Sequence, residues 1–164
     1  MPQGSILGPL LFVLYVDDLG AILKALKSRY TDDTKFGRVI ISESDCHLLQ
    51  LEILEVEKWC AQNNLSSNAA KSNILTVTNK LNPVIFEYKA ANSDIIPRAE
   101  NVKDLGVLID NSLKFNANVE FIVNKAFRTL GFIMRTTQAF TSITTIVHLY
   151  RALVLSQLDY ASPV

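Results

Sequence analysis

Apolar positions in the first forty residues follow a helical spacing and then give way to β-favouring segments. Leucine and isoleucine recur mostly at three- and four-residue intervals from Leu7 to Leu26, and a Gly-Pro pair at positions 8–9 suits a first helical turn. The pattern therefore predicts one helix over residues 8–26. Two β-favouring segments then flank Asp32 and Asp33, which predicts a β-hairpin with these turn-tolerant aspartates at its tip.

The remaining pattern alternates between helices and short strands. Ser42 and Asp45 resemble a capping box, and the helix that they start carries Leu49 and Ile53 on one face and ends at an Asn-Asn pair. Strands are expected over residues 73–78, 84–88 and 102–109, and helices over 117–136 and 142–155. The order of elements predicts an α/β fold with antiparallel hairpins, followed by a helical segment.

Composition narrows the class of protein. The chain has 164 residues, sixteen basic and sixteen acidic side chains and 49% hydrophobic residues, which excludes a disordered tail and a globally basic nucleic-acid coat. Its longest apolar run has eleven residues, whereas a bilayer span needs about 20. Cys46 and Cys60 lie fourteen positions apart on one predicted helix, roughly 20 Å, which is too far for a disulfide. These features predict an intracellular protein, nuclear or cytoplasmic, that is neither secreted nor membrane-bound.

Positive charge gathers toward the C-terminus despite the neutral total. Residues 114–151 contain five basic side chains and one acidic side chain. On a helical period Lys125, Arg128 and Arg135 fall at about 0°, 300° and 280°, away from the apolar stripe at about 60–140°. Such a face is either simply solvated or a surface that follows nucleic-acid phosphates.

Two aspartate pairs share the pattern Tyr-x-Asp-Asp. Carboxylates at a hairpin tip, such as Asp32 and Asp33, can hold Mg²⁺ and leave coordination positions for phosphates, although a solvated turn has the same sequence. The second pair, Asp17 and Asp18, falls inside the predicted helix. Neighbouring carboxylates on a helix point about 100° apart, so we reject this pair as catalytic.

Several blocks of the chain, in the family's order, resemble the reverse transcriptases of non-LTR retrotransposons. Residues 2–12 read Pro-Gln-Gly-Ser-Ile-Leu-Gly-Pro-Leu-Leu-Phe, like the family's P-Q-G-S-x-L-G-P-L-L-F, and residues 15–19 are similar to its Y-I-N-D-L. Residues 30–35 resemble its F-A-D-D-T-K hairpin, and the spacing of Trp59, Leu65, Asn68 and Lys71 is similar to W…L-x-x-N-x-x-K. Residues 103–110 resemble K-D-L-G-V-x-x-D, and residues 125–133 and 149–154 are similar to the thumb helices. The resemblance covers essentially the whole chain.

The resemblance implies a role for each matched position. Asp32 and Asp33 would hold catalytic Mg²⁺, and Lys71 would lie near the leaving pyrophosphate. The residues implied to line the nucleotide and template are Gln3, Gly4, Ser5 and Tyr30. Leu105 and Gly106 would position the primer end, while Lys125, Arg128 and Arg135 would contact the nucleic-acid backbone. The implied partners are an RNA template, a DNA primer and deoxynucleoside triphosphates.

The resemblance also divides the chain and sets a limit on its activity. Residues 1–112 would form part of a polymerase palm, and residues 113–164 a thumb-like segment. The family's first catalytic aspartate precedes the Pro-Gln-Gly-Ser motif, and this sequence begins at Met1-Pro2. We therefore expect half of the two-metal site to belong to a missing N-terminal part of the same reading frame, and the chain alone to be inactive. The alternative is a co-opted remnant that binds nucleic acid without polymerising.

Overall fold

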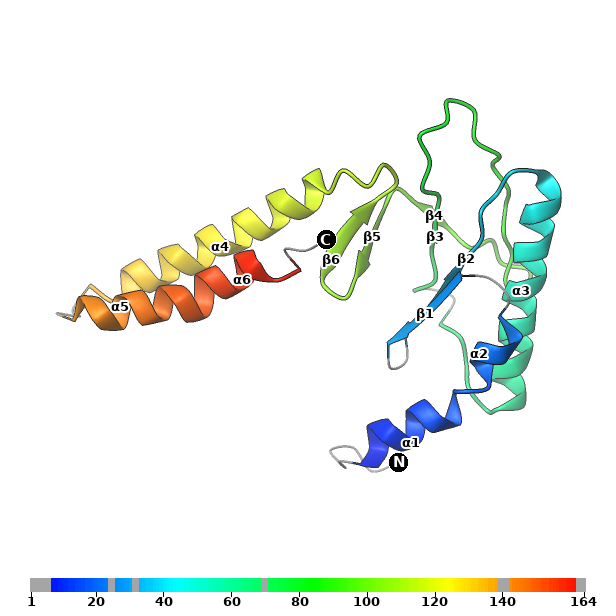
Figure 1. The fold of residues 1–164 in the computed structure, drawn as a ribbon, viewed down its shortest axis with the longest axis horizontal. Coiled ribbons are helices and arrows are strands. Elements are labelled where there is room, and N and C mark those ends of the chain that lie inside the picture. The colour runs from blue at the N-terminus through cyan, green and yellow to red at the C-terminus, as the bar shows by residue number, and fades with distance from the viewer. Residues whose placement is uncertain (1–6, 24–25, 31–32, 69–70, 139–141, 162–164) are drawn as a thin grey trace. The chain divides into compact units, whose positions relative to one another are not determined.

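The computed structural model describes residues 7–23, 26–30, 33–68, 71–138 and 142–161, and it divides into two compact units. Unit 1 comprises Met1–Ile74 and Lys80–Arg98, and unit 2 comprises Leu75–Asn79 and Ala99–Val164 (Figure 1). The expected α/β class is confirmed, since helices alternate with small antiparallel sheets in the described residues. None of the helices described is long and apolar enough to cross a membrane.

The N-terminal helical region of unit 1 is broken. Helix α1 (Leu7–Tyr15) and helix α2 (Leu19–Ile22) are separated by a turn over residues 16–18, so the prediction of one helix over residues 8–26 was wrong. Asp18 is the N-cap residue of α2. Aspartate has low helix propensity because its side chain competes for hydrogen bonds, and contacts from outside the helices stabilise this turn.

The predicted aspartate hairpin is present. Strand β1 (Leu26–Tyr30) pairs antiparallel with strand β2 (Asp33–Gly37), and Tyr30 stands opposite Asp33. The connecting residues, 31 and 32, lie outside the described part of the chain. The hairpin is shorter than the β-favouring sequence suggested, because β2 ends at Gly37.

Helix α3 (Glu43–Gln62) is the longest described helix of unit 1 and begins where the sequence predicted. The Asp45 carboxylate accepts hydrogen bonds from the backbone N–H groups of Ser42, at 2.9 Å, and Ile41, at 3.0 Å. These bonds complete the capping box and lower the pKa of Asp45 below its ordinary value.

Two apolar clusters pack against α3. One contains Cys46, Leu49, Ile53 and Tyr88, and the other joins Val16 and Leu19 of the α1–α2 region to Trp59. Both cysteines are free thiols, as their spacing predicted.

Of the strand expected over residues 73–78, only β3 (Ile74–Leu75) is present, and it pairs with strand β4 (Arg98–Ala99). The prediction of a strand over residues 84–88 was wrong, because no strand covers these described residues.

Unit 2 contains a hairpin that the sequence pattern did not predict. Residues 102–109, expected as one strand, belong to β5 (Asn101–Asp104) and β6 (Val107–Asp110), which pair antiparallel. Leu105 and Gly106 form the turn, with φ of 45° and 89°. Two left-handed residues match the twist of a two-residue hairpin.

The helical segment of unit 2 follows the prediction closely. Helix α4 (Asn116–Thr136) packs along α5 (Ile143–Tyr150), a π-helical stretch η1 (Arg151–Leu155) and α6 (Ser156–Asp159), which succeed one another without a break (Figure 1). Ala126, Ile133 and Val154 form the buried core between them.

Candidate functional site

Asp33 is the one member of the predicted metal-binding pair that the structure describes. It is the first residue of β2 and is exposed. Its carboxylate makes no hydrogen bond or ion pair with another residue in the described ranges. Asp32 lies outside those ranges. The Asp33 carboxylate, at the start of β2, is therefore not engaged by the described residues and can bind a ligand.

The second aspartate pair is engaged within the protein. The indole Nε1 of Trp59, which is buried, donates to the Asp18 carboxylate at 3.2 Å. The Asp17 carboxylate lies 3.4 Å from the Arg29 guanidinium, which also donates to the Val16 carbonyl oxygen. These contacts tie the α1–α2 turn to α3 and β1. The pair lies in this turn and not inside a helix as predicted, but its partners give a separate reason to exclude it from catalysis.

An ion pair fastens the far end of the hairpin to α3. Arg38, directly after β2, donates to Glu52 at 2.6 Å, and the Glu52 side chain is only 7% exposed. Arg38 Nε and Glu52 Oε2 are buried without a hydrogen-bond partner among the described residues. The sequence does not predict this ion pair. Along α3, Glu52 is recognisable only as a charged residue on the apolar face, and no pattern links it to Arg38.

Lys71 lies on an exposed turn before β3. Its backbone N–H donates to the Asn68 carbonyl at 3.0 Å and side-chain oxygen at 3.2 Å, so the two matched residues of this motif are joined locally. No ion pair links Lys71 to Asp33 within the described residues. The predicted nucleotide residues Gln3, Gly4 and Ser5 lie outside the described part.

The turn predicted to position the primer is held from α6. Tyr160, just after that helix, donates its hydroxyl proton to the Leu105 carbonyl at 2.6 Å. A Cβ atom at Gly106 would lie 3.4 Å from the Tyr160 ring, so the ring rests against the turn. The sequence reading missed Tyr160, since 55 positions separate it from Leu105.

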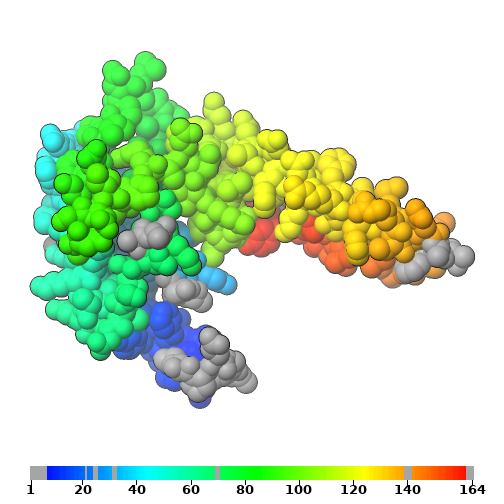
Figure 2. Space-filling view, turned by 180° about the vertical axis from the view of Figure 1, so that it is seen from behind, coloured from blue at the N-terminus to red at the C-terminus, as the bar shows by residue number. Residues whose placement is uncertain are grey.

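The predicted basic face of α4 is exposed. Lys125, Arg128 and Arg135 all reach solvent, while Ala126 and Ile133 are buried on another side of the helix. The Arg135 guanidinium lies against α4 one turn before its own position. A Cβ atom added at Gly131 would be only 3.3 Å from it. In Figure 2, helix α4 (yellow) lies at the surface of the molecule along its length.

The described residues fit a catalytic metal only in part. Asp33 offers the oxygen ligand that Mg²⁺ prefers, but no group of three or more histidine, cysteine, aspartate or glutamate side chains converges in the described ranges. Two-metal chemistry needs carboxylates from separate strands. The described residues therefore supply one ligand and not a complete site.

Comparisons with known proteins point in one direction. Residues 1–134 match the family described as reverse transcriptase (RNA-dependent DNA polymerase). The RNA-directed DNA polymerase from mobile element jockey of Drosophila funebris is 27% identical over 142 residues, which cover 79% of this chain and 15% of that protein. The probable RNA-directed DNA polymerase from transposon X-element of Drosophila melanogaster is 28% identical over 127 residues, covering 73% and 14%. The chain thus spans only a small part of the length of these relatives. No solved structure matches the chain significantly.

Proposed function

Because the chain belongs to the reverse transcriptase (RNA-dependent DNA polymerase) family, we propose that it is a working part of a non-LTR retrotransposon polymerase that copies RNA into DNA. One observation carries the proposal. Hairpin β1–β2 presents the exposed carboxylate of Asp33, which has no partner among the described residues, in the motif that resembles the family's catalytic hairpin. The competing Asp17-Asp18 pair is occupied by Arg29 and Trp59.

The proposed metal ligands are Asp32 and Asp33. Bound Mg²⁺ would neutralise phosphate charge and polarise the reacting oxygen atoms. The chain's own contribution is to hold these carboxylates on a paired hairpin, and Tyr30, opposite Asp33, borders the same tip. Lys71 is proposed as the cation for the leaving pyrophosphate. Gln3, Gly4 and Ser5 are proposed to line the nucleotide and template.

Residues 1–112 are proposed as part of the palm, and residues 113–164 as thumb. Leu105 and Gly106 would position the primer end, supported by the hydrogen bond from Tyr160 that fixes their turn. Lys125, Arg128 and Arg135 would contact phosphates and not bases, because copying any template forbids sequence preference. The proposed partners are an RNA template, a DNA primer and deoxynucleoside triphosphates, and the proposed location is the nucleus or cytoplasm.

Primer extension on poly(rA)–oligo(dT) with Mg²⁺ tests the proposal. The chain should replace the matching region of the jockey polymerase, which supplies the rest of the enzyme. Extension is expected to disappear in Asp32→Ala and Asp33→Ala and to persist in the matched variant Asp17→Ala. Extension that survives Asp32→Ala, or that depends equally on Asp17, contradicts the site assignment.

The 164-residue chain by itself should give no extension in the same assay. Its described residues bring no further carboxylate to Asp33, and losing part of a metal site removes several kcal/mol of transition-state stabilisation, with about tenfold in rate for each 1.36 kcal/mol. Robust extension that disappears in Asp32→Ala would show that the chain contains a complete site.

A further inference from the structure

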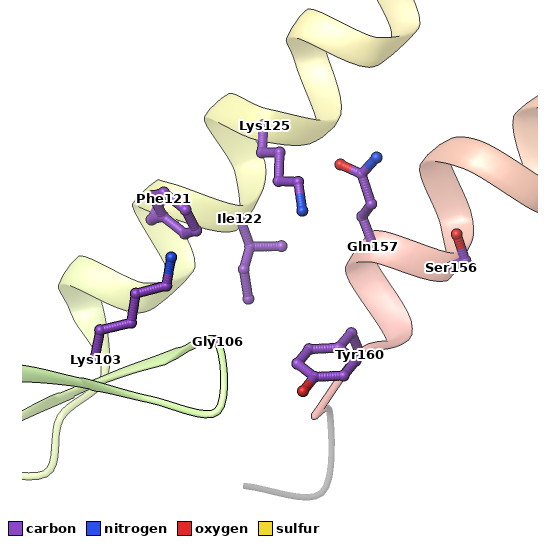
Figure 3. A pocket seen from close by; sticks show the side chains of 8 residues that line it. All are labelled: Lys103, Gly106, Phe121, Ile122, Lys125, Ser156, Gln157 and Tyr160. Atoms are coloured by element: carbon purple, nitrogen blue, oxygen red, sulfur yellow. The ribbon is translucent and has the colours of Figure 1, made fainter. Parts of the chain in front are cut away.

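The helices of unit 2 each have a side that packs within the unit. Figure 3 shows Ile122 of α4 and Gln157 of α6 in the space between these two helices. Ala126 and Ile133 are buried on this same side of α4, and Leu149 of α5 packs against them. These contacts define the packed side of α4 and of α5, from which the other sides can be measured.

A second apolar stripe runs along each of these helices and is exposed. Its members are Val119, Val123, Phe127 and Met134 on α4, and Ile143, Val147 and Tyr150 on α5. Their exposed fractions lie between 37% and 77%. At 100° per residue, the stripe is centred about 80° from the packed side on α4 and about 100° from it on α5, in the same rotational sense.

The two stripes lie on the same face of the helix pair. Helix α4 and the region from α5 to α6 pack side by side and run antiparallel (Figure 1). Reversing the direction of one helix reverses its rotational sense, so two equal offsets point to the same side of the pair. These seven side chains form one surface, the apolar face. Lys125, Arg128 and Arg135 are offset in the opposite sense on α4, so the basic face looks the other way.

The apolar face is large. Two of its seven side chains are aromatic, a type that covers about 150–250 Å² when fully buried, so the whole face exposes several hundred Å². Apolar patches of this size on a protein surface mark interaction sites. A standard protein–protein interface buries about 800 Å² on each partner, and the apolar face supplies the greater part of that area.

The apolar face is also uncharged, which indicates the kind of partner. Helix α5 contains no aspartate, glutamate, lysine or arginine, and on α4 only Glu120 borders the stripe. A face without charge offers a charged partner no complementary group. It can meet an identical face without repulsion between like charges, as a two-fold axis requires.

We propose that the apolar face is a dimer interface between two copies of this chain. A two-fold axis brings the same patch of both copies together. Two pairs of antiparallel helices packed face to face form a four-helix bundle, and the seven side chains of each copy then belong to its core. The basic face of α4 stays exposed in both copies. The interface goes beyond the proposed polymerase function and requires neither metal nor nucleic acid.

Sedimentation velocity of the 164-residue chain over a concentration series, in EDTA and high salt, tests the proposal. The chain should form a species of twice its mass of 18.3 kDa. The dimer should persist in high salt because salt does not screen apolar contacts. High salt also removes any association bridged by nucleic acid, and EDTA removes divalent metal, so a negative result leaves the polymerase proposal to its own assay.

Two matched pairs of variants locate the interface. Phe127→Glu should weaken dimerisation about a hundredfold, because each dimer then buries two unpaired carboxylates. Phe132→Glu changes a side chain that is 56% exposed on the basic side of the same helix and should leave the dimer unchanged. On α5, Val147→Glu should act like Phe127→Glu, whereas its exposed neighbour His148, on another side of the helix, should tolerate His148→Glu.

Three results would overturn the proposal. The chain stays monomeric at every concentration, which would assign the apolar face to a different polypeptide. Phe127→Glu or Val147→Glu dimerises as tightly as its control. Leu11→Glu, on the exposed helix α1 of unit 1, abolishes the dimer. All five changes replace exposed side chains, and circular dichroism confirms that each variant is folded.

Discussion

Aspartates with the same sequence neighbours have different roles in this chain. Asp18 accepts from the indole of Trp59, and Asp17 lies beside Arg29, whereas Asp33 is exposed and unpaired in the described residues. A bond to a buried donor affects stability more than a pair at the surface does. The role of each carboxylate therefore depends on which partner the fold brings to it.

Asp18→Ala should destabilise the chain by about 1–3 kcal/mol, because it leaves the Trp59 N–H without its acceptor. Asp17→Ala removes only an exposed pair, for which about 0–1 kcal/mol is usual. Urea unfolding followed by Trp59 fluorescence measures both. Asp18→Asn keeps an acceptor oxygen and should recover much of the loss; equal losses in Asp17→Ala and Asp18→Ala would contradict the assigned roles.

Asp110 makes folding sensitive to acid. Its carboxylate accepts from the Ser112 hydroxyl at 2.5 Å and from backbone N–H groups that include Phe115 at 2.7 Å. The Ser112 hydrogen bond, followed by the backbone bonds, lowers the pKa of Asp110 to about 2. A lowered pKa contributes stability above the unfolded value of about 4, and this contribution is lost as the pH falls toward 2.

The urea midpoint of the unchanged chain should therefore fall more steeply between pH 4 and pH 2 than that of Asp110→Asn. Asp159→Asn is the control, since Asp159 is an exposed aspartate of the same unit for which the described structure shows no such bonds. Parallel pH profiles for the chain and Asp110→Asn would contradict the assignment.

At the scale of elements, the position of hairpin β1–β2 depends on contacts at both of its strands. Arg29 of β1 bonds to the α1–α2 turn, and Arg38 after β2 bonds to Glu52 in the middle of α3. Pairing within the hairpin specifies its register, whereas these contacts, together with the packing of Phe36 on the apolar cluster of α3, specify its orientation on α3.

Arg38→Ala should destabilise unit 1 by about 3 kcal/mol, because it leaves the Glu52 carboxylate buried without a partner. The double variant Arg38→Met/Glu52→Leu should regain most of that stability, since replacing both charges by apolar side chains removes the desolvation penalty. Chemical denaturation of the two variants compares them. A double variant no more stable than Arg38→Ala would show that packing, and not the stranded charge, causes the loss.

At the scale of the whole molecule, charge is neutral overall but segregated. The basic face of α4 belongs to a helix whose other side packs on α5, η1 and α6. A neutral protein with one basic face can bind phosphates locally without being a general polycation.

Binding to an RNA–DNA duplex should weaken with salt, and the variant Lys125→Ala/Arg128→Ala/Arg135→Ala should reduce the log–log slope by about three, one for each lost contact. Fluorescence anisotropy across a salt titration gives affinity and slope. Two single variants form a matched pair. Arg128→Ala should reduce the slope by about one, whereas Lys58→Ala, which changes an exposed lysine on α3, should leave it unchanged. Equal slopes in the triple variant and the unchanged chain would make this face a merely solvated one.

The sequence by itself determined the features that depend on neighbouring residues. The hairpin at Asp33, the capping box of Ser42 and Asp45, the free cysteines on one helix and the exposed basic face of α4 all follow from short-range periodicity and turn chemistry. The β5–β6 hairpin also had a local signal in Gly106, although the β-favouring residues on both sides of it predicted one strand over residues 102–109.

Tertiary structure decided the rest. The first helix is broken at a turn that binds distant residues through the second aspartate pair. These bonds, the Arg38–Glu52 contact and the bond from Tyr160 to Leu105 join residues that are 12 to 55 positions apart. Such contacts depend on which surfaces meet after the helices and hairpins have packed, and no periodicity along the chain encodes that. The pattern could therefore locate the candidate carboxylates, but only the packed structure shows which described aspartates are already paired.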